Sequence, residues 1–243
     1  PFNEFEGNNS WGYNPNFYFA PDKAYGTKND YKEFIDACHG LGMIVIQDIV
    51  LNHSYGSSPL VRLYWDDVQS RPAANNPWFN VTSPNTTYSW GFDFNHESAA
   101  TKQFVDSVNK YWMSEYKVDG FRYDFAKGFT NTPGDGSAYD ASRIVNLERM
   151  AHVVWNANPN AYVILELFAP NEEEKVLAAF EKGMLVWGNA NSTFTQASMG
   201  FNDNNKSDFS QASASNRGFT QPGLVTYMES HDEERIMFKN INS

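Results

Sequence analysis

The sequence of 243 residues predicts an α/β fold built on parallel strands, and two observations lead to this prediction. First, short apolar runs of strand length alternate with periodic stretches of helix length along most of the chain. Second, the apolar runs are almost continuous, as strands are when helices cover both faces of a sheet. Doubly wound sheets and (β/α) barrels both satisfy this pattern. Because no glycine-rich dinucleotide fingerprint follows any of the runs, the barrel is favoured.

The order of the elements follows from the same patterns. Strands are expected at residues 43–53, 118–124, 161–167, 184–187 and 224–228. Helices are expected at residues 31–39, 97–116, 139–155 and 172–182. Asn29 and Asp30 are the expected cap of the first helix, which Gly40 and Gly42 end.

A long polar stretch, rich in Pro and Asn, separates the first strand from the second helix. It runs from residue 54 to about residue 95, which exceeds the length of an ordinary connection. We therefore expect an inserted domain, domain B, at 54–95, and a larger domain, domain A, made of 1–53 and 96–243.

The charge balance limits the classes of partner. With 18 Lys and Arg against 29 Asp and Glu, the formal net charge is −11. Nucleic acids and anionic membranes need a basic surface, so neither is an expected partner. No apolar run approaches the roughly 18 residues of a transmembrane segment. The single cysteine, Cys38, excludes an intramolecular disulfide.

The composition also favours one kind of ligand. Aromatic residues make up 16%, while charged residues make up 19%, below the roughly 25% of an average globular protein. Aromatic faces beside amides and hydroxyls suit a neutral polyhydroxylated ligand such as a carbohydrate. A large core with many Asn-containing turns would give the same composition.

Polar groups gather where four of the expected strands end. They are Asp48 with Asn52 and His53, Arg122 with Asp124, Glu166, and His231 with Asp232. Carboxyl ends of barrel strands face a common mouth, where catalytic groups come from several strands at once. Any single Asp at a strand end is more simply a helix cap or a loop residue.

Two of these groups are harder to explain by structure alone. Glu166 lies inside an apolar run, and a desolvated Glu holds its proton, as a general acid must. Arg122 lies two residues before Asp124, so both side chains point to one face of the strand. There the guanidinium would keep the carboxylate ionised and oriented, as a nucleophile requires. A structural salt bridge is the alternative.

Taken in chain order, the strand-end motifs resemble the four signature regions of the α-amylase family of glycoside hydrolases, family 13. The matching segments are residues 48–53, 120–127, 165–167 and 229–232. In the family these regions lie on barrel strands three, four, five and seven. Residues 10–15 with 18–21 also resemble the segment after strand two, and residues 91–95 resemble the motif that closes domain B.

The resemblance implies a role for each matching residue. Asp124 matches the nucleophile, Glu166 the general acid/base, and Asp232 the carboxylate that stabilises the transition state. The matches to residues that bind or orient the substrate are Tyr13, His53, Arg122, Lys127 and His231.

The resemblance also bears on calcium. Asn52 and Asp93 match positions that bind structural calcium in many α-amylases, although some relatives carry these residues without the metal. The family often has His after the lysine of its second region, whereas Gly128 follows Lys127 here. This departure affects a contact to the leaving part of the substrate and part of the calcium site. No cofactor is expected for the chemistry itself.

The activity implied is that of a retaining α-glycoside hydrolase acting on α-1,4-glucans, such as starch and malto-oligosaccharides, by double displacement. A transglycosylase or branching enzyme of the same family stays open, and so does a non-catalytic barrel used for binding. A metal phosphohydrolase built on His231 and Asp232 is disfavoured, because the pair ends a strand instead of lying on a helix.

The extent of the matches predicts an incomplete barrel. They begin after the position of strand two and stop soon after strand seven, so we expect about strands two or three to seven of a longer catalytic domain. Open sheet edges would favour self-association, and an incomplete barrel weakens the expectation that the chain alone is active. The first residues show no signal-peptide pattern. By analogy we expect a secreted or cell-surface bacterial protein, since polymeric glucan is met outside the cytoplasm.

Overall fold

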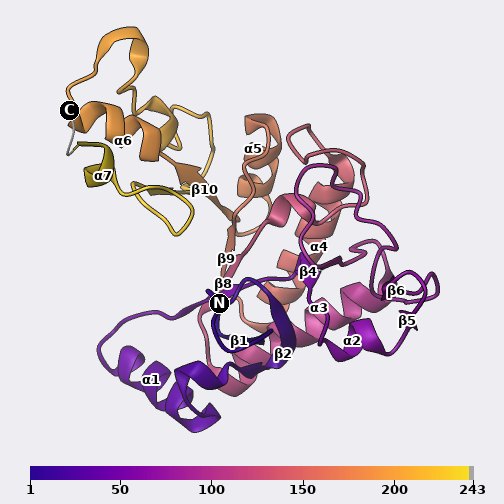
Figure 1. The fold of residues 1–243 in the computed structure, drawn as a ribbon. Helices are drawn as coiled ribbons and strands as arrows, with labels where there is room; N and C mark the ends of the chain where they lie inside the picture. The colour runs from indigo at the N-terminus through magenta and orange to yellow at the C-terminus, as the bar shows by residue number, and fades with distance from the viewer. Residues whose placement is uncertain (241–243) are drawn as a thin grey trace.

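A computed structural model describes residues 1–240 and has an open parallel sheet at its centre (Figure 1). The described sheet has five strands in the order β11-β10-β9-β8-β3, and every neighbouring pair is parallel. The strands are β3 (Ile46–Ile49), β8 (Gly120–Tyr123), β9 (Tyr162–Leu165), β10 (Leu185–Asn189) and β11 (Leu224–Tyr227). Each lies within or beside a run that the sequence predicted, so the incomplete barrel is confirmed.

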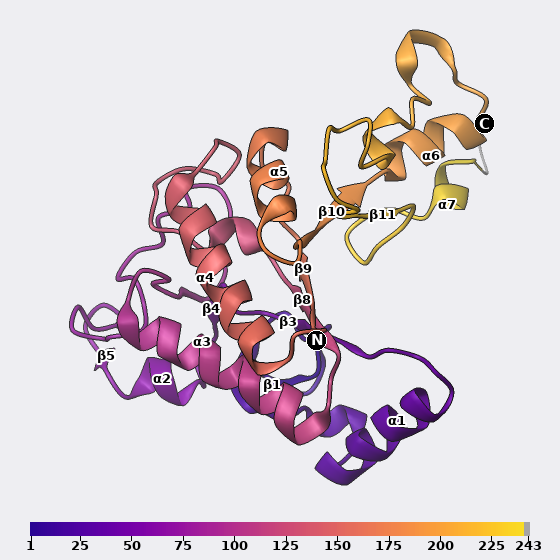
Figure 2. The ribbon, with the colours of Figure 1, turned by 180° about the vertical axis from the view of Figure 1, so that it is seen from behind.

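Helices alternate with the strands along the chain (Figure 2). They are α1 (Lys28–Gly40), α3 (Ala99–Tyr111), the π-helix η2 (Trp112–Tyr116), α4 (Ala141–Ala157), α5 (Asn171–Ala179), α6 (Asn191–Ser198) and α7 (Ile236–Asn240). The core lies between β8 and the helices α3, η2 and α4, where Phe121, Val108, Trp112 and Leu147 are fully buried. The four predicted helices are thus present, whereas α6 and α7 were not predicted.

The cap of α1 differs from the expectation. Thr27 is the N-cap, and its hydroxyl accepts a hydrogen bond from the Asp30 N–H. The Asp30 carboxylate accepts in return from the Thr27 N–H at 2.7 Å, which completes a capping box. Asn29 and Asp30 therefore lie inside the first turn, and the helix starts three residues earlier than predicted.

An antiparallel hairpin precedes α1 and was not predicted. Its strands are β1 (Asn3–Phe5) and β2 (Pro15–Pro21). Tyr18 joins β2 to two distant parts of the chain. Its hydroxyl donates to the His53 carbonyl at 2.7 Å, and its own carbonyl accepts from Trp112 Nε1 at 2.8 Å. The loop between β1 and β2 carries Tyr13.

Residues 54–95 form a separate set of short elements. They are α2 (Pro59–Arg62), β5 (Trp65–Asp66) paired with β6 (Arg71–Pro72), and β7 (Phe92–Asp93), which pairs with β4 (His53–Ser54). In the two-stranded β4–β7 sheet His53 lies opposite Asp93, so the two ends of the segment lie side by side. The division into domains A and B stays a prediction.

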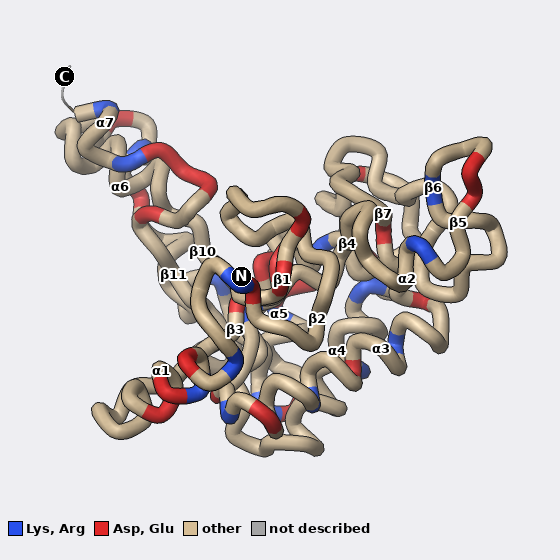
Figure 3. Tube along the Cα trace, turned by 60° about the horizontal axis from the view of Figure 1, so that its bottom comes forward, with Lys and Arg blue, Asp and Glu red and all other residues tan. Residues whose placement is uncertain are grey.

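Among residues 1–240, Lys and Arg are interspersed with Asp and Glu along the backbone (Figure 3). No helix in this range is long and apolar enough to cross a membrane.

Candidate active site

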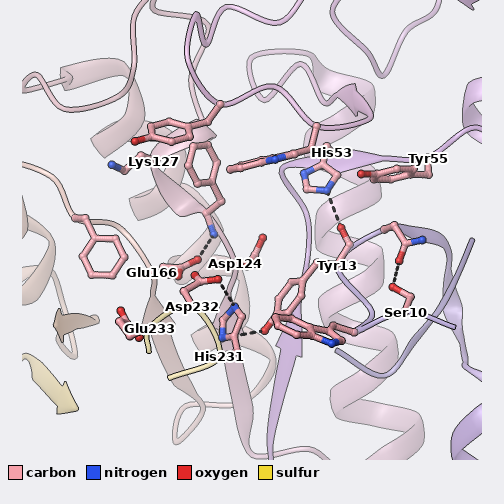
Figure 4. A pocket seen from close by; sticks show the side chains of 16 residues that line it. Ser10, Tyr13, His53, Tyr55, Asp124, Lys127, Glu166, His231, Asp232 and Glu233 are labelled. Atoms are coloured by element: carbon pink, nitrogen blue, oxygen red, sulfur yellow. Dashed lines mark hydrogen bonds and ion pairs between the residues drawn. The ribbon is translucent and has the colours of Figure 1, made fainter. Parts of the chain in front are cut away.

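The strand ends meet at a cavity of about 850 Å³. Side chains that the sequence analysis selected face it from the loops after β3, β8, β9 and β11 and from the β1–β2 loop (Figure 4). They are Tyr13, His53, Asp124, Lys127, Glu166, His231 and Asp232. The structure therefore brings together seven of the eight predicted catalytic and substrate-binding residues at the cavity wall, and Arg122 lies directly behind them.

Main-chain hydrogen bonds place the two buried carboxylates on adjacent strands. Asp124 follows β8, and its N–H donates to the Ile49 carbonyl at 2.9 Å. Glu166 follows β9, and its N–H donates to the Tyr123 carbonyl at 3.1 Å. The Glu166 carbonyl accepts from the Ala126 N–H at 2.8 Å. The ladder thus continues past the strands and fixes both residues at the rim.

Arg122 joins three carboxylates below the cavity floor. Its Nη1 lies 2.7 Å from Asp48 Oδ1 and 3.0 Å from Asp124 Oδ1, and its Nη2 lies 2.8 Å from Glu166 Oε2. Glu166 Oε2 also accepts from the Phe125 N–H at 2.9 Å. Because Arg122 is buried, these contacts are shielded from water and fix both carboxyl groups in orientation.

The pKa of Asp124 is set by opposing effects. Burial raises its pKa well above the usual range, the Arg122 guanidinium opposes this, and the Glu166 and Asp48 carboxylates raise the pKa further. Burial and the neighbouring carboxylates therefore act against the guanidinium on the Asp124 carboxyl group.

Tyr13 and the two histidines form one wall. The Tyr13 ring stacks on His231, with ring centroids 4.6 Å apart, and its hydroxyl donates to Asp48 Oδ2 at 2.8 Å. His53 Nε2 lies 2.9 Å from the Tyr13 carbonyl, which can only accept, so Nε2 carries the hydrogen. Asn52 Nδ2 then donates to His53 Nδ1 at 3.2 Å. Burial lowers the pKa of His53 to about 4, so this imidazole is neutral at pH 7.

Asp232 lines the cavity from its mouth. Its side chain is 62% exposed, and Oδ1 lies 3.4 Å from His231 Nε2. No hydrogen bond or ion pair joins it to Asp124 or Glu166 within the described part of the chain. It follows β11, which is one of the two edge strands of the described five-stranded sheet.

The aromatic lining of the cavity was not predicted from the sequence. Tyr88 and Trp90 come from the insertion and stack at 5.8 Å, and Phe168 and Trp11 lie at other points of the wall. Trp187 of β10 packs 4.2 Å from the Arg122 guanidinium carbon. Aromatic spacing along the sequence gave no signal for these positions, because each reaches the site through tertiary structure.

Asn52 and Asp93 have two features of an oxygen-liganded cation site. Asn52 Oδ1 is buried without a hydrogen-bond partner. Asp93 accepts from Asn80 Nδ2 at 2.7 Å, yet none of the ion pairs in residues 1–240 includes it, and burial raises its pKa to about 7. Both features fit calcium, which binds carboxylate, amide and main-chain oxygens. The described chain has no cluster of three or more His, Cys, Asp or Glu suited to a metal, so amide and main-chain oxygens would have to contribute.

The position of the Asn52 side chain also explains why residue 128 is a glycine. A Cβ at Gly128 would lie 1.9 Å from Asn52 Oδ1, closer than two such atoms can approach. The Asn52 side chain therefore occupies the space that a larger residue would need.

Comparison with known proteins gives a consistent family. The family model of the α-amylase catalytic domain matches residues 5–90. A glycogen debranching enzyme of Klebsiella pneumoniae subsp. pneumoniae is 28% identical over 170 residues, covering 64% of this chain and 25% of the relative. A 1,4-α-glucan-branching enzyme of Aspergillus oryzae is 27% identical over 173 residues, covering 65% and 24%. The chain thus spans about a quarter of the length of these curated relatives.

Solved structures agree on the fold. A cyclomaltodextrinase has a TM-score of 0.70 at 22% identity, covering 98% of this chain and 41% of its own. An α-amylase from Geobacillus thermoleovorans, complexed with acarbose, has a TM-score of 0.68 at 17% identity, covering 100% and 52%.

Proposed function

Since the chain belongs to the α-amylase family of glycoside hydrolases, we propose that it acts on α-glucans by retaining double displacement. Asp124 is the nucleophile, Glu166 is the general acid/base, and Asp232 stabilises positive charge on the reacting sugar. Tyr13, His53 and His231 hold that sugar, Arg122 orients the two buried carboxylates, and Lys127 binds the glucan at the cavity wall.

The observation that carries this proposal is the pair of buried carboxylates on one guanidinium. Asp124 Oδ1 lies 3.0 Å from Nη1 of Arg122, and Glu166 Oε2 lies 2.8 Å from Nη2 of the same guanidinium. Inverting glycosidases separate their carboxyls by about 6.5–9.5 Å to admit a water molecule, whereas retaining enzymes keep them about 5–5.5 Å apart. Two carboxyl groups held on one guanidinium support the closely spaced arrangement of a retaining enzyme.

The reaction has two steps. In the first, an Asp124 carboxylate oxygen bonds to the anomeric carbon while the glycosidic C–O bond breaks, and Glu166 gives its proton to the leaving oxygen. In the second, the Glu166 carboxylate takes a proton from an incoming hydroxyl, whose oxygen bonds to the anomeric carbon and releases Asp124. Water as the acceptor gives hydrolysis, and a glucan hydroxyl gives transfer.

Hydrolysis of α-1,4-glucans is the simplest outcome, and transfer is the alternative because branching enzymes are among the named relatives. The test is to incubate the 243-residue chain with maltoheptaose and to resolve products by chromatography and proton NMR. We expect shorter malto-oligosaccharides only. Longer oligomers or new α-1,6 linkages would assign the transfer reaction. The absence of both turnover and binding at millimolar maltoheptaose would contradict the whole proposal.

We also propose that Asn52 and Asp93 contribute to a calcium site. A ligand that binds only the folded chain stabilises it by about 2.7 kcal/mol at a hundredfold excess over its Kd. In a chain of this size, calcium should therefore raise Tm by roughly 5–10 °C relative to EDTA.

The matched variants are Asp93→Asn and Asp67→Asn. Asp67 lies in the same insertion but is exposed, so its variant should keep the full response to calcium. Asp93→Asn should lose it. Equal melting temperatures in calcium and in EDTA for the unaltered chain would rule the site out, and magnesium at the same concentration controls for ionic strength.

A further inference from the structure

Two consecutive glutamates in the first turn of α5 are buried, although neither lines the cavity. Glu173 is fully buried and Glu174 nearly so. The helix dipole favours acidic residues at this end, but it does not require their burial. Each has an arginine partner instead, Arg143 for Glu173 and Arg217 for Glu174.

Arg143 uses all five of its N–H groups. It binds Glu173 through a fork, with Nε 2.6 Å from Oε1 and Nη2 2.7 Å from Oε2. Its remaining hydrogens go to three main-chain carbonyls: Nη1 donates to Lys127 and Gly136 at 3.1 and 3.0 Å, and Nη2 donates to Ala138 at 3.0 Å. A fully satisfied, fully buried guanidinium with these acceptors fixes one loop, residues 127–140.

Glu173 closes the same loop from its other end. Its Oε2 also accepts from the Asp140 N–H at 2.9 Å. Asp140 is the N-cap of α4 and accepts from the N–H groups of Ser142 and Arg143. The buried ion pair therefore joins the start of α5, the start of α4 and the whole connection after β8.

The held loop carries Lys127 into the cavity wall. Gly136 packs against the stem of this lysine, since a Cβ there would lie 3.1 Å from Lys127 Cδ. Lys127 Nζ lies 5.8 Å from the centre of the Tyr88 ring, which also lines the cavity. Arg143 thus binds the main-chain carbonyls of both residues in this contact, Lys127 and Gly136.

We infer that Arg143, clamped by Glu173, is a positioning residue for glucan binding, which acts by holding Lys127 at the cavity wall. Among the described residues, those lining the cavity include Lys127 but not Arg143, so Arg143 acts through the loop. The inference rests on the proposed function for the identity of the ligand, a chain of α-linked glucose units.

The first test is a double-mutant cycle on maltoheptaose affinity. All variants carry Glu166→Gln to stop turnover, and affinity is measured by calorimetry. Arg143→Lys keeps the charge but loses the fork and the three-carbonyl geometry. It should weaken binding by about 10-fold, the usual cost of disrupting hydrogen bonds to a charged group. Lys127→Ala should weaken binding by about the same factor. The double variant should bind less than about 2-fold more weakly than either single variant, because both substitutions act through one contact.

The matched control is Arg149→Lys. Arg149 lies on the same helix α4 and pairs with Asp106 at 2.9 Å, away from the loop, so its variant should leave the affinity unchanged. Gly136→Ala is the second variant if Arg143→Lys fails to fold. It leaves the ion pair intact and pushes the Lys127 stem, and it should give the same loss of affinity.

A glucan-free measurement separates this inference from the proposed function. Hydrogen exchange of the amides in residues 127–140 should become at least about 10-fold faster in Arg143→Lys than in Arg149→Lys, because opening of the loop loses its anchor. If none of the variants binds maltoheptaose but the difference in exchange is present, the proposed function is overturned. The inference then keeps the role of Arg143 in holding the loop and loses glucan as the ligand. Unchanged exchange, or multiplicative losses of affinity in the cycle, would overturn the positioning role itself.

Discussion

Replacing Glu166 by Gln is expected to reduce turnover of maltoheptaose by about 10²- to 10⁴-fold, the usual contribution of a general acid/base. The amide has the same shape, so its oxygen can still accept from the Phe125 N–H and lie beside the Arg122 guanidinium, and the fold should be preserved. It cannot give a proton to the leaving oxygen. Release of reducing ends measures the loss directly.

A substrate with a better leaving group tests the acid role of Glu166 more specifically. A maltosyl fluoride needs little protonation to leave, so Glu166→Gln should cleave it with a much smaller defect than it shows with maltoheptaose. Asp124→Asn should fail with both substrates. Glu172→Gln, at an exposed position on α5, is the control and should behave as the unaltered chain does. Undiminished turnover of maltoheptaose by Glu166→Gln would remove this residue from the chemistry.

Replacing Gly120 by Ala is expected to destabilise the fold by more than about 4 kcal/mol, a size reserved for backbone or core collisions. Gly120 starts β8 opposite Tyr162 of β9, with φ at 156°. A Cβ there would lie 2.2 Å from the Tyr162 carbonyl oxygen and 2.5 Å from its nitrogen. Because these are main-chain atoms of a central strand, the collision cannot be relieved by a side-chain rotation, and the strand pair must separate.

The control for backbone strain is Gly134→Ala. Gly134 also has a positive φ, 144°, but a Cβ added there would meet no atom within 4 Å among the described residues beyond its chain neighbours. Its cost should be about 1–3 kcal/mol, from the dihedral alone. Urea unfolding followed by circular dichroism compares the two. Equal losses would mean that strand contact at Gly120 is unimportant.

The sequence predicted what depends on local pattern. Apolar runs located all five strands of the described sheet, since a strand buried on both faces reads as continuous hydrophobicity. Polar residues at the ends of those runs located the cavity, because parallel strands end on one edge. The start of α1 was wrong because Thr27 and Asp30 form a reciprocal cap that begins before the apolar periodicity does.

What the sequence could not show depends on distances between elements. The raised pKa of Asp124 could not be predicted from the sequence, because it comes from burial and from the nearby Glu166 and Asp48 carboxylates, which depend on the folded sheet. Tyr88 and Trp90 reach the cavity only because β4 and β7 return the insertion to the strand ends. Arg143 could not be identified from the sequence, since it binds main-chain carbonyls of a loop that carries no recognisable motif.

The measurement that tests the central claim most directly is the capture of the covalent intermediate. The Glu166→Gln chain is incubated with α-maltosyl fluoride, digested and analysed by peptide mass spectrometry. Without an efficient base for the second step, a maltosyl group should accumulate on the peptide that contains Asp124, and product released slowly should keep the α configuration. A maltosyl group on another residue, or product of inverted configuration, would contradict the assignment of Asp124 as the nucleophile of a retaining reaction.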